Sequence, residues 1–222
     1  MLHSSSPGTD RCLDAAPAAS NLPRLSRWKA ASALAVLQLM LGAVAHAGSD
    51  PQPANFDPLT GYRIANYRAP TPSSVPGGTV ISLEELENMV REGKPVLLDV
   101  NAAEGAGPNP VSGVWQLSRQ RVNKAGTVWL PDVGRGVLTP EFETYFKDNL
   151  ARLTGGDMTR AIIIYCQADC WMSWNAVKRA ASYGYTALYW YPDGTDGMRD
   201  WDVSLVESTP VPMSISPGRR ER

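Results

Sequence analysis

Short apolar runs alternate along this chain with stretches that have the apolar spacing of amphipathic helices. Four of these runs, at 95–100, 127–130, 161–165 and 186–190, are predicted to be strands. The clearest is 161–165, with the sequence AIIIY. Because strands that alternate with helices build parallel sheets, the sequence predicts an α/β fold in which a mostly parallel central sheet is flanked by helices.

Three helices are predicted between these strands. Ser82 and Glu85 have the spacing of a capping box, which indicates a helix over 82–93. A second helix is expected over 139–155, with a threonine as its N-cap and proline at its first position. A third helix follows the 161–165 strand and ends at Gly184. A tight turn is expected at 192–197.

The chain divides into four predicted parts. Residues 1–47 are predicted to be a signal peptide with an N-terminal extension, and residues 48–78 a proline-rich lead-in. Residues 79–207 are predicted to form one α/β domain, and residues 208–222 a flexible tail. A chain of 222 residues has room for one ordinary domain with such extensions.

The signal peptide is predicted from an apolar run that follows three basic residues. The run covers about 16 residues, which is short for a membrane span of about 20. It ends in Ala45-His46-Ala47, the small-x-small pattern of a signal-peptidase site. We therefore expect a periplasmic protein that has no membrane contact after cleavage.

Residues 48–222 contain no histidine, since the two histidines of the chain are His3 and His46. This excludes a Ser-His-Asp triad, a Cys-His dyad, a zinc site with histidine ligands and a haem with a proximal histidine. The net charge of −1 provides no basic surface for nucleic acid. No cofactor and no metal are expected.

Two cysteines of this part of the chain, Cys166 and Cys170, follow the 161–165 strand. In parallel sheets, ligands bind beyond the carboxyl ends of the strands, and the start of the next helix stabilises a thiolate. Cys166 is the predicted nucleophile because it leaves the strand, and Cys170 is the predicted resolving thiol. The residues predicted to contact the substrate are Gln167, Ala168, Asp169 and Trp171.

Three interpretations of this pair stay open at the level of sequence: thiol chemistry, an inert structural disulfide, or a two-thiolate contact to a metal. Residues four apart in one continuous helix have Cβ atoms about 5 to 6 Å apart. A disulfide needs roughly 3.5 to 4.5 Å. A bond between the two therefore requires Cys166 to lie in a loop.

The segment 101–126 is rich in glycine, proline and asparagine, and its length indicates a binding or lid loop. Four basic residues in or near this segment are predicted to lie on a solvated face, distant from the cysteine loop, with an anion site as the alternative. They are Arg119, Arg121, Lys124 and Arg135.

The order of the elements resembles the second half of a rhodanese domain. The resemblance covers about residues 80–202: a strand that ends in a cysteine, a short loop, a helix that ends in Gly-Tyr, a strand, and a glycine-containing turn before Trp201. It implies a single rhodanese-like domain with sulfur transfer at Cys166. Rhodanese loops usually carry an arginine where this chain has Trp171, and Asn101 stands where arginine is frequent. We therefore expect weak or absent thiosulfate:cyanide sulfurtransferase activity.

The stretch from Tyr165 to Asn175 also resembles a secreted rhodanese-like group named for its CXXCW motif. That group is associated with alcohol catabolism that depends on pyrroloquinoline quinone. The resemblance implies an exported quinoprotein dehydrogenase or a cytochrome c as partner, with sulfur transfer or thiol–disulfide exchange at the cysteines. The alternative is a non-enzymatic binding module. Stable binding of the quinone itself is not expected, because the chain lacks the tryptophan-docking repeats of quinoprotein propellers.

Overall fold

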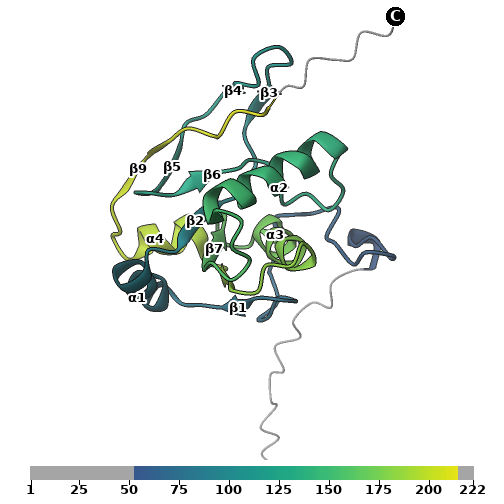
Figure 1. Cartoon of the computed structure of the whole chain (residues 1–222). Coiled ribbons are helices and arrows are strands. Elements are labelled where there is room, and N and C mark those ends of the chain that lie inside the picture. The colour runs from purple at the N-terminus through teal and green to yellow at the C-terminus, as the bar shows by residue number, and fades with distance from the viewer. Residues whose placement is uncertain (1–52, 215–222) are drawn as a thin grey trace, which may run out of the picture. The chain divides into compact units, whose positions relative to one another are not determined.

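A five-stranded sheet forms the centre of the computed structural model, which describes residues 53–214 (Figure 1). Its strands are β1 (Thr79–Val80), β2 (Val96–Asp99), β6 (Val128–Trp129), β7 (Ile162–Tyr165) and β8 (Leu188–Tyr191). Their order is β1-β8-β7-β2-β6, and every neighbouring pair is parallel. The predicted α/β fold class with a mostly parallel sheet is confirmed.

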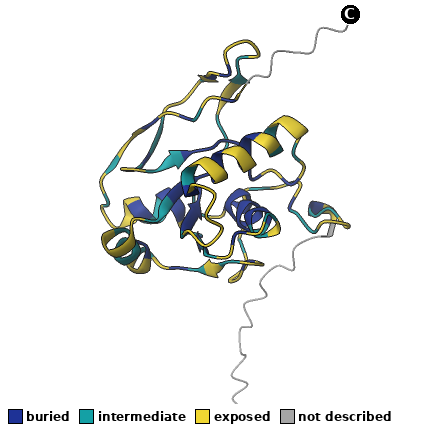
Figure 2. Cartoon of the chain, viewed as in Figure 1, coloured by how far each residue is buried: buried dark blue, intermediate teal, exposed yellow. Residues whose placement is uncertain are grey.

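Helices cover both faces of the sheet. They are α1 (Leu83–Gly93), α2 (Pro140–Thr154), α3 (Trp171–Ser182) and α4 (Gly194–Asp200), preceded by the short 3-10 turn η1 (Pro53–Asn55). Successive residues of β7 face opposite sides. Ile162 and Ile164 belong to the core cluster with α2 and α3, whereas Ile163 and Tyr165 belong to the cluster with α1 and α4. Figure 2 shows that β7 and most of α3 are buried.

The caps of the first two helices agree with the local sequence. The hydroxyl of Ser82 accepts from the N–H of Glu85, and the Glu85 carboxylate accepts from the N–H of Ser82. Thr139 caps α2 by accepting from the N–H of Phe142. These caps depend only on residues three positions apart, so the sequence pattern is sufficient to predict them.

The composition of the segment 101–126 predicted one long loop, and this prediction is wrong. The segment contains a hairpin of β3 (Gly105–Pro108) and β4 (Trp115–Leu117), followed by β5 (Arg121–Lys124). Strand β5 pairs antiparallel with β9 (Leu205–Ser208), which lies more than eighty positions further on. A pairing between such distant segments leaves no local signal in the composition.

The C-terminal part of the chain is more ordered than expected. The turn predicted at 192–197 is instead the beginning of α4. Residues 209–213, expected to belong to a flexible tail, pack against the domain. The carbonyl of Val211 accepts from Trp115 Nε1 at 2.9 Å and from the Tyr145 hydroxyl at 2.6 Å.

The lead-in, as far as it is described, is docked along α3. The side chain of Asn175 accepts from the N–H of Arg63 at 3.0 Å and donates to the carbonyl of Arg63 at 2.8 Å. Trp174 Nε1 donates to the carbonyl of Ser74 at 2.9 Å. The predicted signal peptide, residues 1–47, lies outside the described residues. None of the helices within 53–214 has the length and apolar content needed to cross a membrane.

Candidate active site

The two cysteines lie in the loop between β7 and α3, at the carboxyl end of the strand in the middle of the sheet. Strand β7 ends at Tyr165, and α3 begins at Trp171 with Cys170 as its N-cap residue. The loop turns sharply at Asp169, whose φ of 50° is in the left-handed region that aspartate tolerates. Because neither cysteine is inside a helix, the two sulfurs can approach each other.

The side chain of Cys166 is fully buried. Its sulfur lies 3.1 Å from Ser173 Oγ, 3.3 Å from the carbonyl oxygen of Cys170 and 3.7 Å from that of Gln167. Burial raises the pKa of Cys166 well above its ordinary value, and the neighbouring thiol of Cys170 acts in the same direction. Since two carbonyl oxygens also face the sulfur, Cys166 is held as a protonated thiol.

Cys170 is 2% exposed, but its surroundings favour the anion. A hydrogen bond from the Cys166 thiol lowers the pKa of Cys170 against the opposing effect of burial. The N–H of Met172 and the charge of Arg68 lower the pKa of Cys170 further. The N-cap position adds the positive end of the α3 dipole. The pKa of Cys166 is thus raised and that of Cys170 lowered, so Cys170 is the cysteine that ionises more easily.

Both cysteines are free thiols in this structure, which does not contain the structural disulfide that the sequence left open. Within residues 53–214, no group of three or more His, Cys, Asp or Glu side chains is placed to hold a metal ion. A two-thiolate metal contact would therefore lack a third ligand of these types in that part of the chain.

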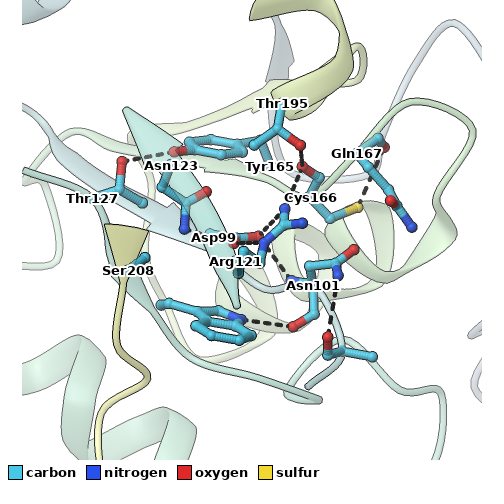
Figure 3. A network of polar contacts seen from close by, with 12 residues as sticks. Asp99, Asn101, Arg121, Asn123, Thr127, Tyr165, Cys166, Gln167, Thr195 and Ser208 are labelled. Carbon is cyan, nitrogen blue, oxygen red and sulfur yellow. Dashed lines mark hydrogen bonds and ion pairs between the residues drawn. The ribbon is translucent and has the colours of Figure 1, made fainter. Parts of the chain in front are cut away.

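The main-chain carbonyl of Cys166 is held from a different side than its sulfur (Figure 3). Arg121 Nη2 donates to this carbonyl at 2.9 Å, and the N–H of Thr195 donates at 3.1 Å. Arg121 is paired with Asp99, a fully buried carboxylate at the end of β2 that also accepts from Asn123. Burial acts to lower the pKa of Arg121, but the charge of Asp99 outweighs it and raises that pKa.

Helix α4 starts in direct contact with the cysteine loop. Gly194 has a φ of 54°, and a Cβ at this position would lie 2.6 Å from the carbonyl oxygen of Cys166. The N–H of Ala168 donates to the Asp196 carboxylate at 3.2 Å. The glycine therefore allows α4 to approach the loop closely enough to hold it.

A cavity of about 200 Å³, here named the arginine cavity, opens beside the loop on the Arg121 side. Its polar lining consists chiefly of Asn101, Glu104, Arg119, Arg121, Gln167 and Arg199. The prediction that Arg119 and Arg121 are distant from the cysteine loop is wrong, because β5 folds back over the ends of β2 and β7. The prediction that Arg121 is solvated is also wrong, since its side chain is 11% exposed. Neither cysteine lines this cavity.

The predicted substrate-binding residues lie in different surroundings. Gln167 lines the arginine cavity, and Ala168 contributes its N–H to Asp196. Asp169 is exposed. The ring of Trp171 packs edge-on against Phe56 with 5.2 Å between centroids, on the side of the lead-in. Of the four, only Gln167 lines the cavity.

Sequence reasoning missed several residues that shape the loop. Ser173 has the local signal of a residue near a helix start, but that signal does not indicate that its hydroxyl accepts from Trp190 Nε1 at 2.9 Å and contacts the Cys166 sulfur. The glycine-rich stretch before Trp201 could have pointed to Thr195. No sequence signal indicates Arg121, because its contacts to Asp99 and Cys166 depend on the folded position of β5.

No protein-family model matches the chain, and no curated protein sequence matches it significantly. Among solved structures, the chain is similar to a thiosulfate sulfurtransferase from Pseudomonas aeruginosa, with 15% identity and a TM-score of 0.43. The similar region covers 62% of this chain and 22% of the sulfurtransferase, so this chain spans less than a quarter of that protein.

Two further solved structures are similar at the same low level. The polysulfide-sulfur transferase homodimer from Wolinella succinogenes has 15% identity and a TM-score of 0.37, over 59% of this chain and 79% of that one. A variant of EanB in complex with hercynine has 18% identity and a TM-score of 0.41, over 68% of this chain and 36% of that one. The structure itself defines an α/β protein with a reduced cysteine pair at the carboxyl end of its middle strand.

Proposed function

We propose that this protein performs thiol-based sulfur chemistry with Cys166 and Cys170, most directly the transfer of a sulfane sulfur. The observation that carries the proposal is the position of two free cysteines in one loop at the carboxyl end of β7, with Cys166 Sγ 3.3 Å from the carbonyl oxygen of Cys170. Burial raises the pKa of Cys166, and the hydrogen bond between the thiols lowers the pKa of Cys170. Such a pair holds a nucleophile and a proton donor in one loop. The resemblance of the sequence to rhodaneses implies the same chemistry.

In this proposal Cys170 is the attacking thiolate, whereas the sequence pattern favoured Cys166. The reason is the set of atoms around each sulfur. Cys166 faces two carbonyl oxygens, which repel an anion, whereas Cys170 is the N-cap residue of α3 and lies near the positive end of the helix dipole. A thiolate is the nucleophilic form, so the sulfur that ionises more easily attacks first.

The reaction begins on the outer sulfur of a persulfide donor, R–S–SH. The Cys170 thiolate attacks that sulfur, the S–S bond of the donor breaks, and R–S⁻ leaves, so that Cys170 becomes a persulfide. An acceptor thiolate can then take the outer sulfur and restore the Cys170 thiolate. Alternatively, Cys166 attacks the inner sulfur and forms a disulfide with Cys170, and the outer sulfur leaves with the two protons as H₂S.

Thiol–disulfide exchange is the second candidate, and the position of both free cysteines in one loop favours it. Two cysteines that lie outside any helix in the same loop can form a disulfide, provided that a partner disulfide accepts the two electrons. The third candidate is a non-enzymatic binding module. The burial of both sulfurs favours it, and it requires that neither cysteine reacts with a persulfide or a disulfide.

The proposed setting is the periplasm, where the protein would assist quinoprotein-dependent alcohol oxidation through an exported dehydrogenase or a cytochrome c. The signal-peptide pattern that ends at Ala47 supports this setting, as does the resemblance to the CXXCW group. Comparison of the protein in whole cells and in the osmotic-shock fraction tests the location. Recovery in the cytoplasmic fraction with an intact N-terminus would contradict it.

Intact-mass spectrometry after incubation with cysteine persulfide tests the chemistry. The Cys166→Ser variant should gain one sulfur atom and keep it, because no second thiol attacks the inner sulfur. The wild-type protein should instead lose two hydrogens and release sulfide as the disulfide forms. The Cys170→Ser variant should show neither change.

Each other outcome assigns the site differently. Loading of Cys170→Ser but not of Cys166→Ser would show that Cys166 is the nucleophile, as the sequence pattern favoured. Thiols that stay unmodified in all three proteins, while the denatured wild-type protein is modified, would identify a binding module.

A further inference from the structure

Residues 67–70 of the lead-in, here named the strap, lie against Cys170. The N–H of Ala69 donates to the carbonyl of Asp169 at 3.0 Å, and the N–H of Trp171 donates to the carbonyl of Tyr67 at 2.9 Å. These two bonds make an antiparallel bridge in which Arg68 is opposite Cys170. The strap therefore lies on the cysteine loop as a short strand lies on the edge of a sheet.

The strap uses main-chain groups that are otherwise without a partner in the helix. Trp171 is the first residue of α3, and the first N–H groups of a helix have no acceptor inside it. The strap supplies that acceptor through Tyr67. It also binds the indole, because Trp171 Nε1 donates to the carbonyl of Pro70 at 3.1 Å. Any extended segment can make the two main-chain bonds, since they do not depend on its side chains.

The register of the bridge brings position 68 directly opposite Cys170. The two hydrogen bonds involve the residues on either side, Ala69 with Asp169 and Trp171 with Tyr67, so Arg68 and Cys170 form a non-hydrogen-bonded pair. In such pairs the Cα atoms are about 4.5 Å apart and the side chains are close. A cysteine in the place of Arg68 would have its sulfur next to that of Cys170.

We infer that the substrate is a cysteine or cysteine persulfide in an extended segment of another protein, and that this segment pairs with residues 169–171 in place of the strap. The inference rests on the proposed function and names the substrate class of that site. The strap then occupies the position of the substrate and protects Cys170 until it is exchanged.

The burial of the sulfurs supports a protein substrate. Cys166 is fully buried, Cys170 is 2% exposed, and the arginine cavity is lined by neither of them. A small persulfide makes none of the main-chain bonds that replace those of the strap. An extended segment can make both main-chain hydrogen bonds of the strap. The N–H of Trp171 and the carbonyl of Asp169 are then paired both before and after the exchange.

The test uses a synthetic peptide of residues 63–74 that carries the change Arg68→Cys, with its cysteine activated as a 2-thiopyridyl disulfide. Attack by Cys170 on the peptide sulfur forms a mixed disulfide and releases pyridine-2-thiolate, which is followed by absorbance. The protein is the Cys166→Ser variant, so that the mixed disulfide persists. The peptide should react at least about fivefold faster than activated N-acetylcysteine, as expected for about one net hydrogen bond.

Two proline changes provide matched controls. A peptide that also carries Ala69→Pro lacks the N–H that bonds to Asp169 and should lose the advantage. The same change in the protein weakens its own strap and should speed capture of the first peptide at least about fivefold. Ser73→Pro in the protein should leave capture unchanged, because the N–H of Ser73 has no hydrogen bond in the described structure.

The outcomes separate the strap from the chemistry. If activated N-acetylcysteine reacts as fast as the peptide, and Ala69→Pro in the protein changes neither rate, the strap inference is wrong while Cys170 remains a reactive thiol. If Cys170 reacts with neither probe in any folded variant, the proposed function fails as well.

Discussion

At the scale of single residues, two sulfur atoms four positions apart differ in their tendency to ionise. The difference comes from their immediate neighbours. Two carbonyl oxygens face the sulfur of Cys166, whereas Cys170 is the N-cap residue of α3. A shift of one pKa unit corresponds to about 1.4 kcal/mol, so one hydrogen bond to a charged sulfur is sufficient to separate the two.

The pH dependence of alkylation tests this arrangement. The pKa of Cys170 is lowered, so its thiolate persists to lower pH and its alkylation rate should fall only below the pH at which an ordinary thiol protonates. In a Cys166→Ser variant the hydroxyl still donates, and the midpoint should stay low. In a Cys166→Ala variant the donor is lost, and the midpoint should rise by about one pH unit.

The measurement is the rate of iodoacetamide labelling of position 170 between pH 5 and about 10, a range that spans the ordinary thiol pKa. Equal midpoints in the serine and alanine variants would mean that the hydrogen bond between the two side chains does not set the ionisation of Cys170.

At the scale of elements, α4 and β5 hold the cysteine loop from outside the β7–α3 unit. Helix α4 reaches the carbonyl of Cys166 through the N–H of Thr195, and β5 reaches it through Arg121. The close approach of α4 depends on Gly194, since a Cβ there would overlap the loop main chain. The loop is thus held by two elements that the sequence pattern did not assign to the site.

A Gly194→Ala variant should lower the free energy of unfolding by about 2 to 5 kcal/mol. About 1 to 2 kcal/mol comes from the left-handed φ, and about 1 to 3 kcal/mol from the forced contact with Cys166. Gly155→Ala is the matched control, because Gly155 has a φ of 66° with no atom within 4 Å of the added Cβ. It should cost only the first amount.

Urea denaturation of both variants measures the difference. A Gly155→Ala variant that is destabilised as much as Gly194→Ala would show that the contact between α4 and the loop contributes nothing beyond the backbone conformation.

The elements that could be predicted from the sequence are those whose signals are local. The strand at 161–165, the caps at Ser82 and Thr139 and the position of the cysteines at a strand end follow from residues close together in the chain. The contact of Arg121 with Cys166 joins residues 45 positions apart, and β5 pairs with β9 across a longer separation. Such contacts depend on the whole fold, so neither the orientation of the sulfurs nor the arginine cavity could be predicted.

At the scale of the whole molecule, the loop borders a cavity lined by three arginines and is also covered by the strap. The sequence indicated weak thiosulfate turnover because basic residues were expected to be far away. Three arginines in fact line a cavity that includes Gln167 of the cysteine loop. The expectation of weak turnover is nevertheless retained for a different reason, because both sulfurs are enclosed.

Wild-type protein should therefore show little thiosulfate:cyanide sulfurtransferase activity, and the Ala69→Pro variant should show more because its strap is weakened. Thiocyanate production by the two proteins is the measurement, with Ser73→Pro as the control. Robust turnover by the wild-type protein that is lost in Arg199→Ala would instead identify the cavity as the entry of the anion and would contradict the enclosure of the site.

The cover over the cysteines is built from segments that are far apart in the chain, and this affects how the protein matures. The bonds from Trp171 to Pro70 and from Trp174 to Ser74 span 101 and 100 positions. Contacts of such separation form slowly, because long loops must close first. Cysteines four positions apart meet at once in the unfolded chain. In the proposed periplasmic setting, oxidation of the thiols would compete with folding of the newly made protein, and the faster process would decide whether the thiols are buried in reduced or oxidised form.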